Sequence, residues 1–136
     1  MEKRDYLLRQ IDALGRILTR LRELIAGGAT DVARGEIQEE MRNAGLELSM
    51  ANALDARTLL MLLGSPVLDV RRAFVVASLL HMDALRARAD GDRQWATRSD
   101  VNALALLTSV RPMLDAERGT LADRLVDEIR GTPAPG

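Results

Sequence analysis

Residues 5–25, DYLLRQIDALGRILTRLRELI, contain the clearest helical pattern of the sequence, and the rest of the chain is expected to be organised around them. Apolar side chains recur there at spacings of three and four, which places them in one row along an α-helix. No proline interrupts the stretch. A broad apolar stripe of about six turns needs cover from other helices of the chain or from a second copy. The row consists of Leu7, Ile11, Leu14, Leu18, Leu21 and Ile25.

The length and composition exclude several classes of protein. The 136 residues suit a single domain, expected over 1–131, followed by a flexible tail over 132–136. The chain has no cysteine, so it has neither a disulfide framework nor a thiolate metal site. A formal net charge of −1 argues against a general electrostatic role on nucleic acid or on acidic membranes. Three aromatic residues are too few for a base-stacking platform.

The sequence also carries no targeting or membrane signal. The N-terminal residues MEKRDYLLRQ are charged and lack the apolar core of a signal peptide. The longest apolar run, residues 73–77, is far too short to span a bilayer. We therefore expect a soluble cytoplasmic protein of bacterial type, with no nucleic-acid or membrane partner.

Glycines divide the first half of the chain. Gly27 and Gly28 end the first helix, and the short connection after them predicts an antiparallel neighbour over 31–46. Gly45 is expected to weaken that second helix. Residues 47–54 are ambiguous between a loop and a helical extension.

A short apolar helix is expected next, over 56–63, with Asp55 as its cap. Because it is apolar on most sides, it is predicted to be buried as a plug between two hairpins. Ser65 as a cap, with Pro66 at the first helical position, predicts the start of a long helix over 67–89.

The second half of the chain repeats the hairpin pattern. The Asp-Gly-Asp turn at 90–92 connects the long helix to another helix over 93–110. Pro112 disfavours continuation, and Asp115 can cap a last amphipathic helix over 116–130. No stretch shows strand alternation. The sequence therefore predicts an all-α fold, with two antiparallel helix hairpins, a short buried helix between them and a C-terminal helix.

The second hairpin fits the tetratricopeptide (TPR) repeat pattern in part. That pattern requires small residues where two helices cross closely, at fixed offsets around a Gly-Asp turn. With the turn aligned, Ala84 and Ala96 fall at small positions, but Asp83 and Asp100 fall where apolar or aromatic residues are expected. The first hairpin fits less well, so the pattern indicates two repeat-like hairpins and not a tandem array.

An N-terminal motif, a glycine turn, an apolar short helix and the later Gly-Asp hairpin occur in this order over roughly residues 3–107. In this combination the chain resembles a bacterial family of small TPR-like helical proteins with no assigned function. The resemblance implies a TPR-like helical bundle and a soluble protein of the interaction type, and it implies no catalytic residues. The motif comprises Asp5, Tyr6, Leu7, Arg9, Ile11, Leu14 and Leu18.

His81 is the single histidine of the chain. As a general base it would need a partner on the same helix face, but Asp83 is two residues away and lies on another face. A di-iron site in a helix bundle would need a glutamate three residues before the histidine, where the chain has Ser78. The pattern therefore favours a structural or surface role for His81.

Glu36, Glu39 and Glu40 form the one acidic cluster on an expected helix. This motif resembles the one that all-α nucleotide pyrophosphohydrolases of the MazG type use to hold Mg²⁺, an ion that prefers carboxylate oxygens. Those enzymes need a second acidic pair on another helix, and here only Asp83 is available. A solvated helix face is the better interpretation, and a metal-dependent nucleotide hydrolase is the alternative function.

A third possibility is a regulator that binds an acidic partner. Arg71, Arg72 and Arg86 place positive charge along one expected helix. Asp69 and Asp83 lie among these arginines and largely cancel their field. A mixed, solvated surface is the preferred interpretation of this segment.

The leading functional hypothesis is a non-enzymatic protein-interaction or scaffold module, with no cofactor and no metal. Its apolar helix faces exceed what so small a chain is expected to cover, so some of this surface is predicted to close a homodimer. The protein partner itself is not identified by the sequence. The residues predicted for the dimer interface are Leu7, Leu14, Leu21, Leu121 and Leu125.

Overall fold

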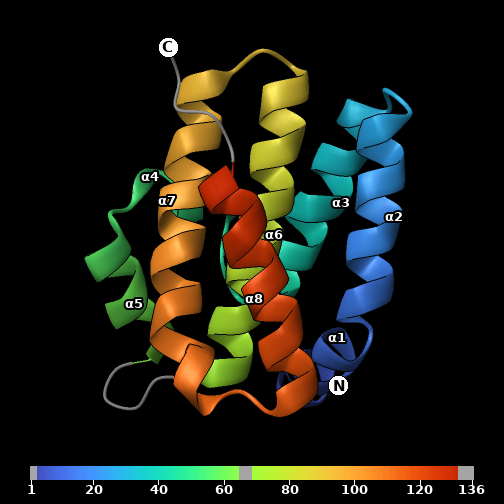
Figure 1. Ribbon diagram of the computed structural model, residues 1–136. Helices are drawn as coiled ribbons and strands as arrows, with labels where there is room; N and C mark the ends of the chain where they lie inside the picture. The colour runs from blue at the N-terminus through green and yellow to red at the C-terminus, as the bar shows by residue number, and fades with distance from the viewer. Residues whose placement is uncertain (1–2, 65–68, 132–136) are drawn as a thin grey trace.

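The structure, a computed structural model, describes residues 3–64 and 69–131, and within them every regular element is helical (Figure 1). The all-α prediction is therefore confirmed. Among these residues no helix is long and apolar enough to cross a membrane. The elements are α1 (Lys3–Asp12), α2 (Leu14–Ala26), α3 (Thr30–Asn43), α4 (Leu48–Ala53), α5 (Ala56–Gly64), α6 (Val70–Ala89), α7 (Arg93–Val110), the 3-10 turn η1 (Arg111–Met113) and α8 (Ala116–Gly131).

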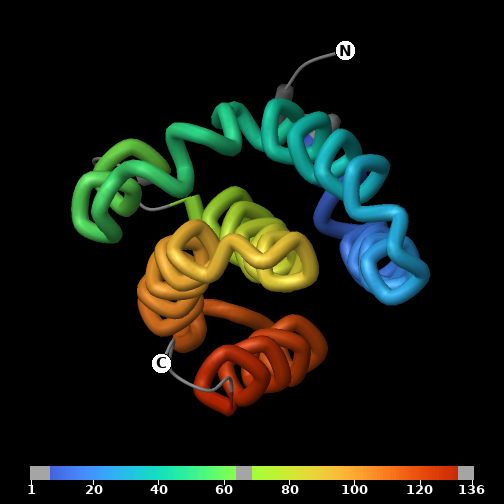
Figure 2. Tube along the Cα trace, turned by 90° about the horizontal axis from the view of Figure 1, so that it is seen from above, coloured from blue at the N-terminus to red at the C-terminus, as the bar shows by residue number. Residues whose placement is uncertain are grey.

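Helix α6 is the centre of the molecule. Viewed from above, α2 to α5 curve round one side of it, while α7 and α8 cover the other (Figure 2). Every side chain from Ala73 to Ala84 is buried. A helix that is buried all round forms the core of its domain. The expectation that the chain is organised around residues 5–25 is therefore wrong, because that segment covers α6 from one side.

Residues 5–25 form two helices and not one. The helix breaks at Ala13, and α1 lies at a steep angle to α2 (Figure 1). Gly15 in the first turn of α2 weakens the helix next to this break. The bend lets Ile11 and Leu14 both reach the core, as do Leu18 and Leu21 further along α2. The apolar row is thus confirmed as a packing surface.

The two hairpins are confirmed: α2 packs against α3, and α6 packs against α7 in the most extensive helix pair of the structure. Two of the predicted caps are also confirmed. Asp55 accepts a hydrogen bond from the Thr58 backbone N–H at 2.7 Å, and Asp115 accepts one from the Arg118 backbone N–H at 2.8 Å. These bonds satisfy N–H groups that have no partner within the helix.

The second helix ends earlier than predicted, at Asn43. Gly45 has a φ of +92°, in the left-handed region that glycine adopts without a steric penalty. It therefore ends α3 and does not weaken its interior. Arg72 fixes this end of the helix, because its Nε donates to the carbonyl oxygen of Ala44 at 2.6 Å.

Two further predictions concern the middle of the chain. The ambiguous residues 47–54 contain a helix, α4. The expected cap Ser65 and the first-turn Pro66 lie outside the described residues. Within them, α6 is capped by Asp69, whose carboxylate accepts from the Arg72 backbone N–H at 3.3 Å.

The prediction that the short apolar helix is a buried plug is wrong. Helix α5 lies on the outer side of α7 (Figure 1). Leu59 and Leu63 face the core, but Met61 and Leu62 are more than half exposed. Neighbouring helices contact α5 on one side, so an apolar surface remains on the other.

Candidate functional site

A buried histidine joins three helices at the centre of the molecule. His81 on α6 is fully buried, and its Nδ1 lies 2.8 Å from Oδ1 of Asp100 on α7. Its Nε2 lies 2.8 Å from Oε2 of Glu128 on α8. Each ring nitrogen therefore has a carboxylate oxygen within hydrogen-bond distance. Of the structural and surface roles predicted for His81, burial of the ring excludes the surface role.

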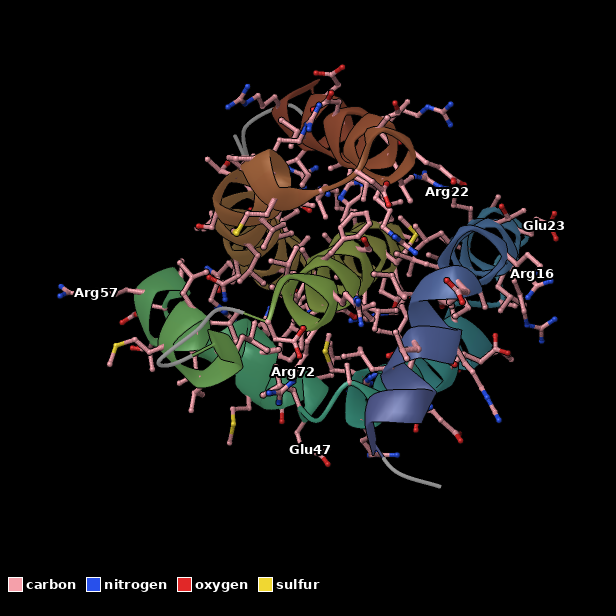
Figure 3. The ribbon with its side chains drawn as sticks, turned by 90° about the horizontal axis from the view of Figure 1, so that it is seen from below. Arg16, Arg22, Glu23, Glu47, Arg57 and Arg72 are labelled. Atoms are coloured by element: carbon pink, nitrogen blue, oxygen red, sulfur yellow. The ribbon has the colours of Figure 1, made fainter. Side chains whose placement is uncertain are left out.

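Two arginines extend this arrangement into a chain of alternating charges. Arg22 on α2 donates from Nη2 to both oxygens of Glu128 at 2.9 Å. Arg22 lies between α2 and α8 in the view from below (Figure 3). At the other end, Nη2 of Arg88 lies 2.7 Å from Oδ2 of Asp100. This five-residue chain, here called the His81 network, therefore connects α2, α8, α6 and α7.

The electrostatic environment of Glu128 predicts that the stability of the protein depends on pH in the acid range. Burial raises the pKa of Glu128, but hydrogen bonds from His81 and Arg22 outweigh this effect, so its pKa lies below the usual value of 4.5. A depressed pKa in the folded state stabilises the protein above pH 4.5, and this contribution is lost as the pH falls below that value. Below pH 4.5 we therefore expect the difference in unfolding free energy between wild type and Glu128→Gln to become smaller. Urea unfolding at a series of acid pH values measures this difference.

The matched control for this prediction is Glu117→Gln. Glu117 is an exposed glutamate on α8 with no ion pair among the described residues. Its substitution is expected to leave the acid dependence of unfolding unchanged. A stability difference for Glu128→Gln that stays constant with pH would contradict the prediction.

A second buried network surrounds Asp83, whose side chain is fully buried. Oδ1 accepts from Nε and Nη2 of Arg86 at 3.1 and 2.8 Å. Oδ2 accepts from the indole N–H of Trp95 and from the hydroxyl of Ser99. Asp83 occupies a position where the TPR pattern requires an apolar residue. Both of its carboxylate oxygens accept hydrogen bonds, and this removes most of the free-energy penalty for burying the side chain.

The predicted arginine site for an acidic partner is wrong. Arg86 is buried and divided between Asp83 and Asp90. Burial lowers the pKa of Arg86, but both carboxylates outweigh this and raise its pKa above the usual value. Arg72 holds the end of α3. Only Arg71 of the three predicted residues is exposed.

Asparagines attach the α4 segment to α7. The Asn52 amide donates to the carbonyl oxygen of Trp95 at 2.9 Å and to the Ser99 hydroxyl at 2.8 Å. Asn102 on α7 donates to the carbonyl oxygens of Ala51 and Leu54. The sequence carries no signal for the burial of these two residues, because an asparagine within a helical pattern is usually exposed.

The acidic cluster lies at a small cavity of about 200 Å³ between α2 and α3. Glu36 forms an ion pair with Arg20 at 2.7 Å, and Glu40 accepts from the Gln10 amide at 2.9 Å, while Glu39 is exposed. In residues 3–64 and 69–131, no group of three histidine or carboxylate side chains is arranged to hold a metal ion.

The leucines predicted for a dimer interface lie within the fold of the single chain. Leu14, Leu21 and Leu125 are buried in the core, and Leu7 and Leu121 are half-buried against it. The core therefore takes up Leu14, Leu21 and Leu125, while Leu7 and Leu121 keep part of their surface exposed. Self-association through these residues stays a prediction.

Four apolar side chains remain exposed around α4 and α5. The Asn52 side chain of α4 accepts from Arg98 of α7 at 3.0 Å, and Val101 follows three residues later on the same side of α7. We call this set of exposed side chains the α4–α5 face. Its members, with the exposed fraction of each, are Met50 (48%), Met61 (63%), Leu62 (51%) and Val101 (57%).

A groove of about 700 Å³ lies at the opposite side of α6, where the α1–α2 bend meets the first half of α8. Ile11, Leu14, Phe74 and Leu121 form its apolar floor. The polar residues along it are Asp12, Arg16, Glu117, Arg118, Thr120 and Arg124.

Compared with known proteins, the chain matches no family model, no curated protein sequence and no solved structure. The resemblance to a TPR-like family is thus supported only at the level of a small all-α helical protein.

Proposed function

We propose that this protein is a non-enzymatic protein-interaction module with a TPR-like arrangement of its two helix hairpins, acting in the cytoplasm without nucleic-acid or membrane partners. The crossing of α6 and α7 supports this arrangement, because Ala84 and Ala96 pack against each other at the predicted small positions. The observation that carries the functional proposal is the α4–α5 face. Apolar side chains gathered on consecutive short helices are typical of protein contact surfaces.

The occupant proposed for the α4–α5 face is a second copy of this chain. A two-fold dimer brings the same patch together from both copies, so the patch has to be complementary to itself. Helix α4 carries no charged residue, and α5 carries one, Arg57, which points out into solvent (Figure 3). Most of the face is therefore apolar, and methionine side chains adapt readily to a contact surface.

Substitution at the face is expected to weaken self-association. The mass of the wild-type protein, measured by light scattering on a sizing column, should rise with protein concentration toward twice the 14.9 kDa mass of the chain. In Met61→Glu, a charged side chain replaces an apolar one in each copy of the symmetric contact, and we expect the dimer dissociation constant to increase at least about tenfold. The exposed position of Met61 means that the fold of the single chain is preserved.

The control is Met113→Glu, because Met113 is similarly exposed, at 52%, but lies on η1. It is expected to associate as wild type does. A wild-type protein that is monomeric at every concentration, or equal effects of the two substitutions, would refute self-association through this face.

A further inference from the structure

The groove at the α1–α2 bend combines an apolar floor with positive charge at its rims. Arg16 lies on the α2 rim and Arg124 on the α8 rim. Within the described residues, neither has a hydrogen bond or an ion pair. Arg118 is different, because Asp115 at 2.7 Å and Asp12 at 3.3 Å compensate its charge. Glu117, at the start of the α8 rim, also has no ion pair among the described residues. The α2 rim therefore carries an uncompensated positive charge at Arg16, and the α8 rim carries one charge of each sign, about two turns apart, at Glu117 and Arg124.

The dimensions of the groove favour an elongated occupant. Along α8 it extends from Glu117 to Arg124, which corresponds to about 10 Å, or two helical turns. The groove is open to solvent along its length, whereas small-molecule sites usually enclose most of their ligand. A helix needs to bury only one face, and its apolar residues at i, i+3 or i+4, and i+7 match a groove of this length.

From these observations we propose that the groove binds an amphipathic helix of a partner protein, with acidic residues on both sides of its apolar row. This inference rests on the proposed function as an interaction module, but it uses a different surface. The acidic helix α3 of a second copy does not meet the requirement, because its apolar residues Ala33, Ile37 and Met41 are buried in its own core. The occupant is therefore a different protein.

Fluorescence anisotropy with a defined peptide tests the proposal on the full chain. The probe is a labelled helical peptide of about five turns, with leucine at alternating spacings of three and four and glutamate on both sides of that row. We expect saturable binding that weakens with added salt, because the charges at the rims are exposed. A peptide of the same composition with the leucine row scrambled should not bind.

Two variants of the protein locate the contact. Arg16→Glu combined with Arg124→Glu is expected to weaken peptide binding about tenfold or more, because two favourable charge contacts become repulsive. Gly15→Leu is expected to block the groove sterically. A Cβ at Gly15 meets no atom within 4 Å, so the fold tolerates this change. The control Arg57→Glu, on α5, should bind as wild type does.

The proposal fails if the peptide does not bind, if the scrambled peptide binds equally well, or if the double charge reversal and Gly15→Leu leave affinity unchanged. These failures are separable from failure of the proposed function. Self-association through the α4–α5 face is read by light scattering and does not involve the groove. Loss of peptide binding with intact dimer formation would therefore refute the groove alone.

Discussion

Replacing Asp83 with alanine is expected to lower the free energy of unfolding by about 3–5 kcal/mol. The substitution leaves the Arg86 guanidinium buried, and Asp90 remains as its partner at 3.0 Å. It also removes the acceptor of the Trp95 indole N–H and of the Ser99 hydroxyl. A domain of this size is stable by only about 5–15 kcal/mol, so this loss is a large fraction of the total.

Urea unfolding followed by circular dichroism measures the effect, and the single tryptophan gives a local readout. Because Asp83 accepts from the Trp95 indole, we expect the emission of Trp95 to change in Asp83→Asn even where the fold persists. The control Asp127→Ala removes an exposed aspartate of α8 and should cost less than about 0.5 kcal/mol. A loss below about 1 kcal/mol in Asp83→Ala would contradict the buried-network interpretation.

A double variant separates the contribution of the ion pair from that of packing. Breaking a buried pair leaves one charge without its partner, whereas replacing both members with apolar residues removes that penalty. Asp83→Leu combined with Arg86→Met should therefore be less destabilising than the sum of the two single changes. Additive losses would mean that the two side chains act independently.

The local structure of the chain was predictable because its signals are local. The bounds of α7 and the caps at Asp55 and Asp115 depend on residues within one helical turn. The central position of α6 was not predictable in the same way. His81 and Asp83 interrupt its apolar surface, and their burial depends on contacts with residues of other helices, such as Asp100, Glu128 and Ser99.

The candidate surfaces were harder to predict from the sequence than the hairpins. The apolar rows of α2 and α8 indicate a packing surface, but the pattern does not distinguish cover by the same chain from cover by a second copy. The structure covers Leu21 and Leu125 with the chain itself and leaves Met61 and Leu62 exposed. Helix α5 was expected to be buried because it is apolar on most sides. Because α5 lies at the edge of the molecule, its apolar side chains are instead the basis of the proposed interface.

The second large effect is expected for His81→Leu, at about 3–5 kcal/mol of lost unfolding free energy. Removing the imidazole ring takes one partner from Asp100 and one from Glu128. Asp100 is almost completely buried, so its remaining contact with Arg88 has to compensate its charge alone. The loss at Glu128 weakens the attachment of α8 to the centre of the molecule.

Hydrogen exchange measured helix by helix distinguishes this account from a general loss of packing. If His81 holds α8, the backbone amides of α8 should exchange faster in His81→Leu, and by a larger factor than those of α7. Ser78→Ala is the matched control, because Ser78 is buried one turn earlier on α6 and donates only to the carbonyl oxygen of Phe74 on its own helix. Equal acceleration in α7 and α8 would refute the role of His81 as the attachment point. Selective acceleration in α8 would also show that the groove proposed for a partner helix has one wall whose position depends on a single buried histidine.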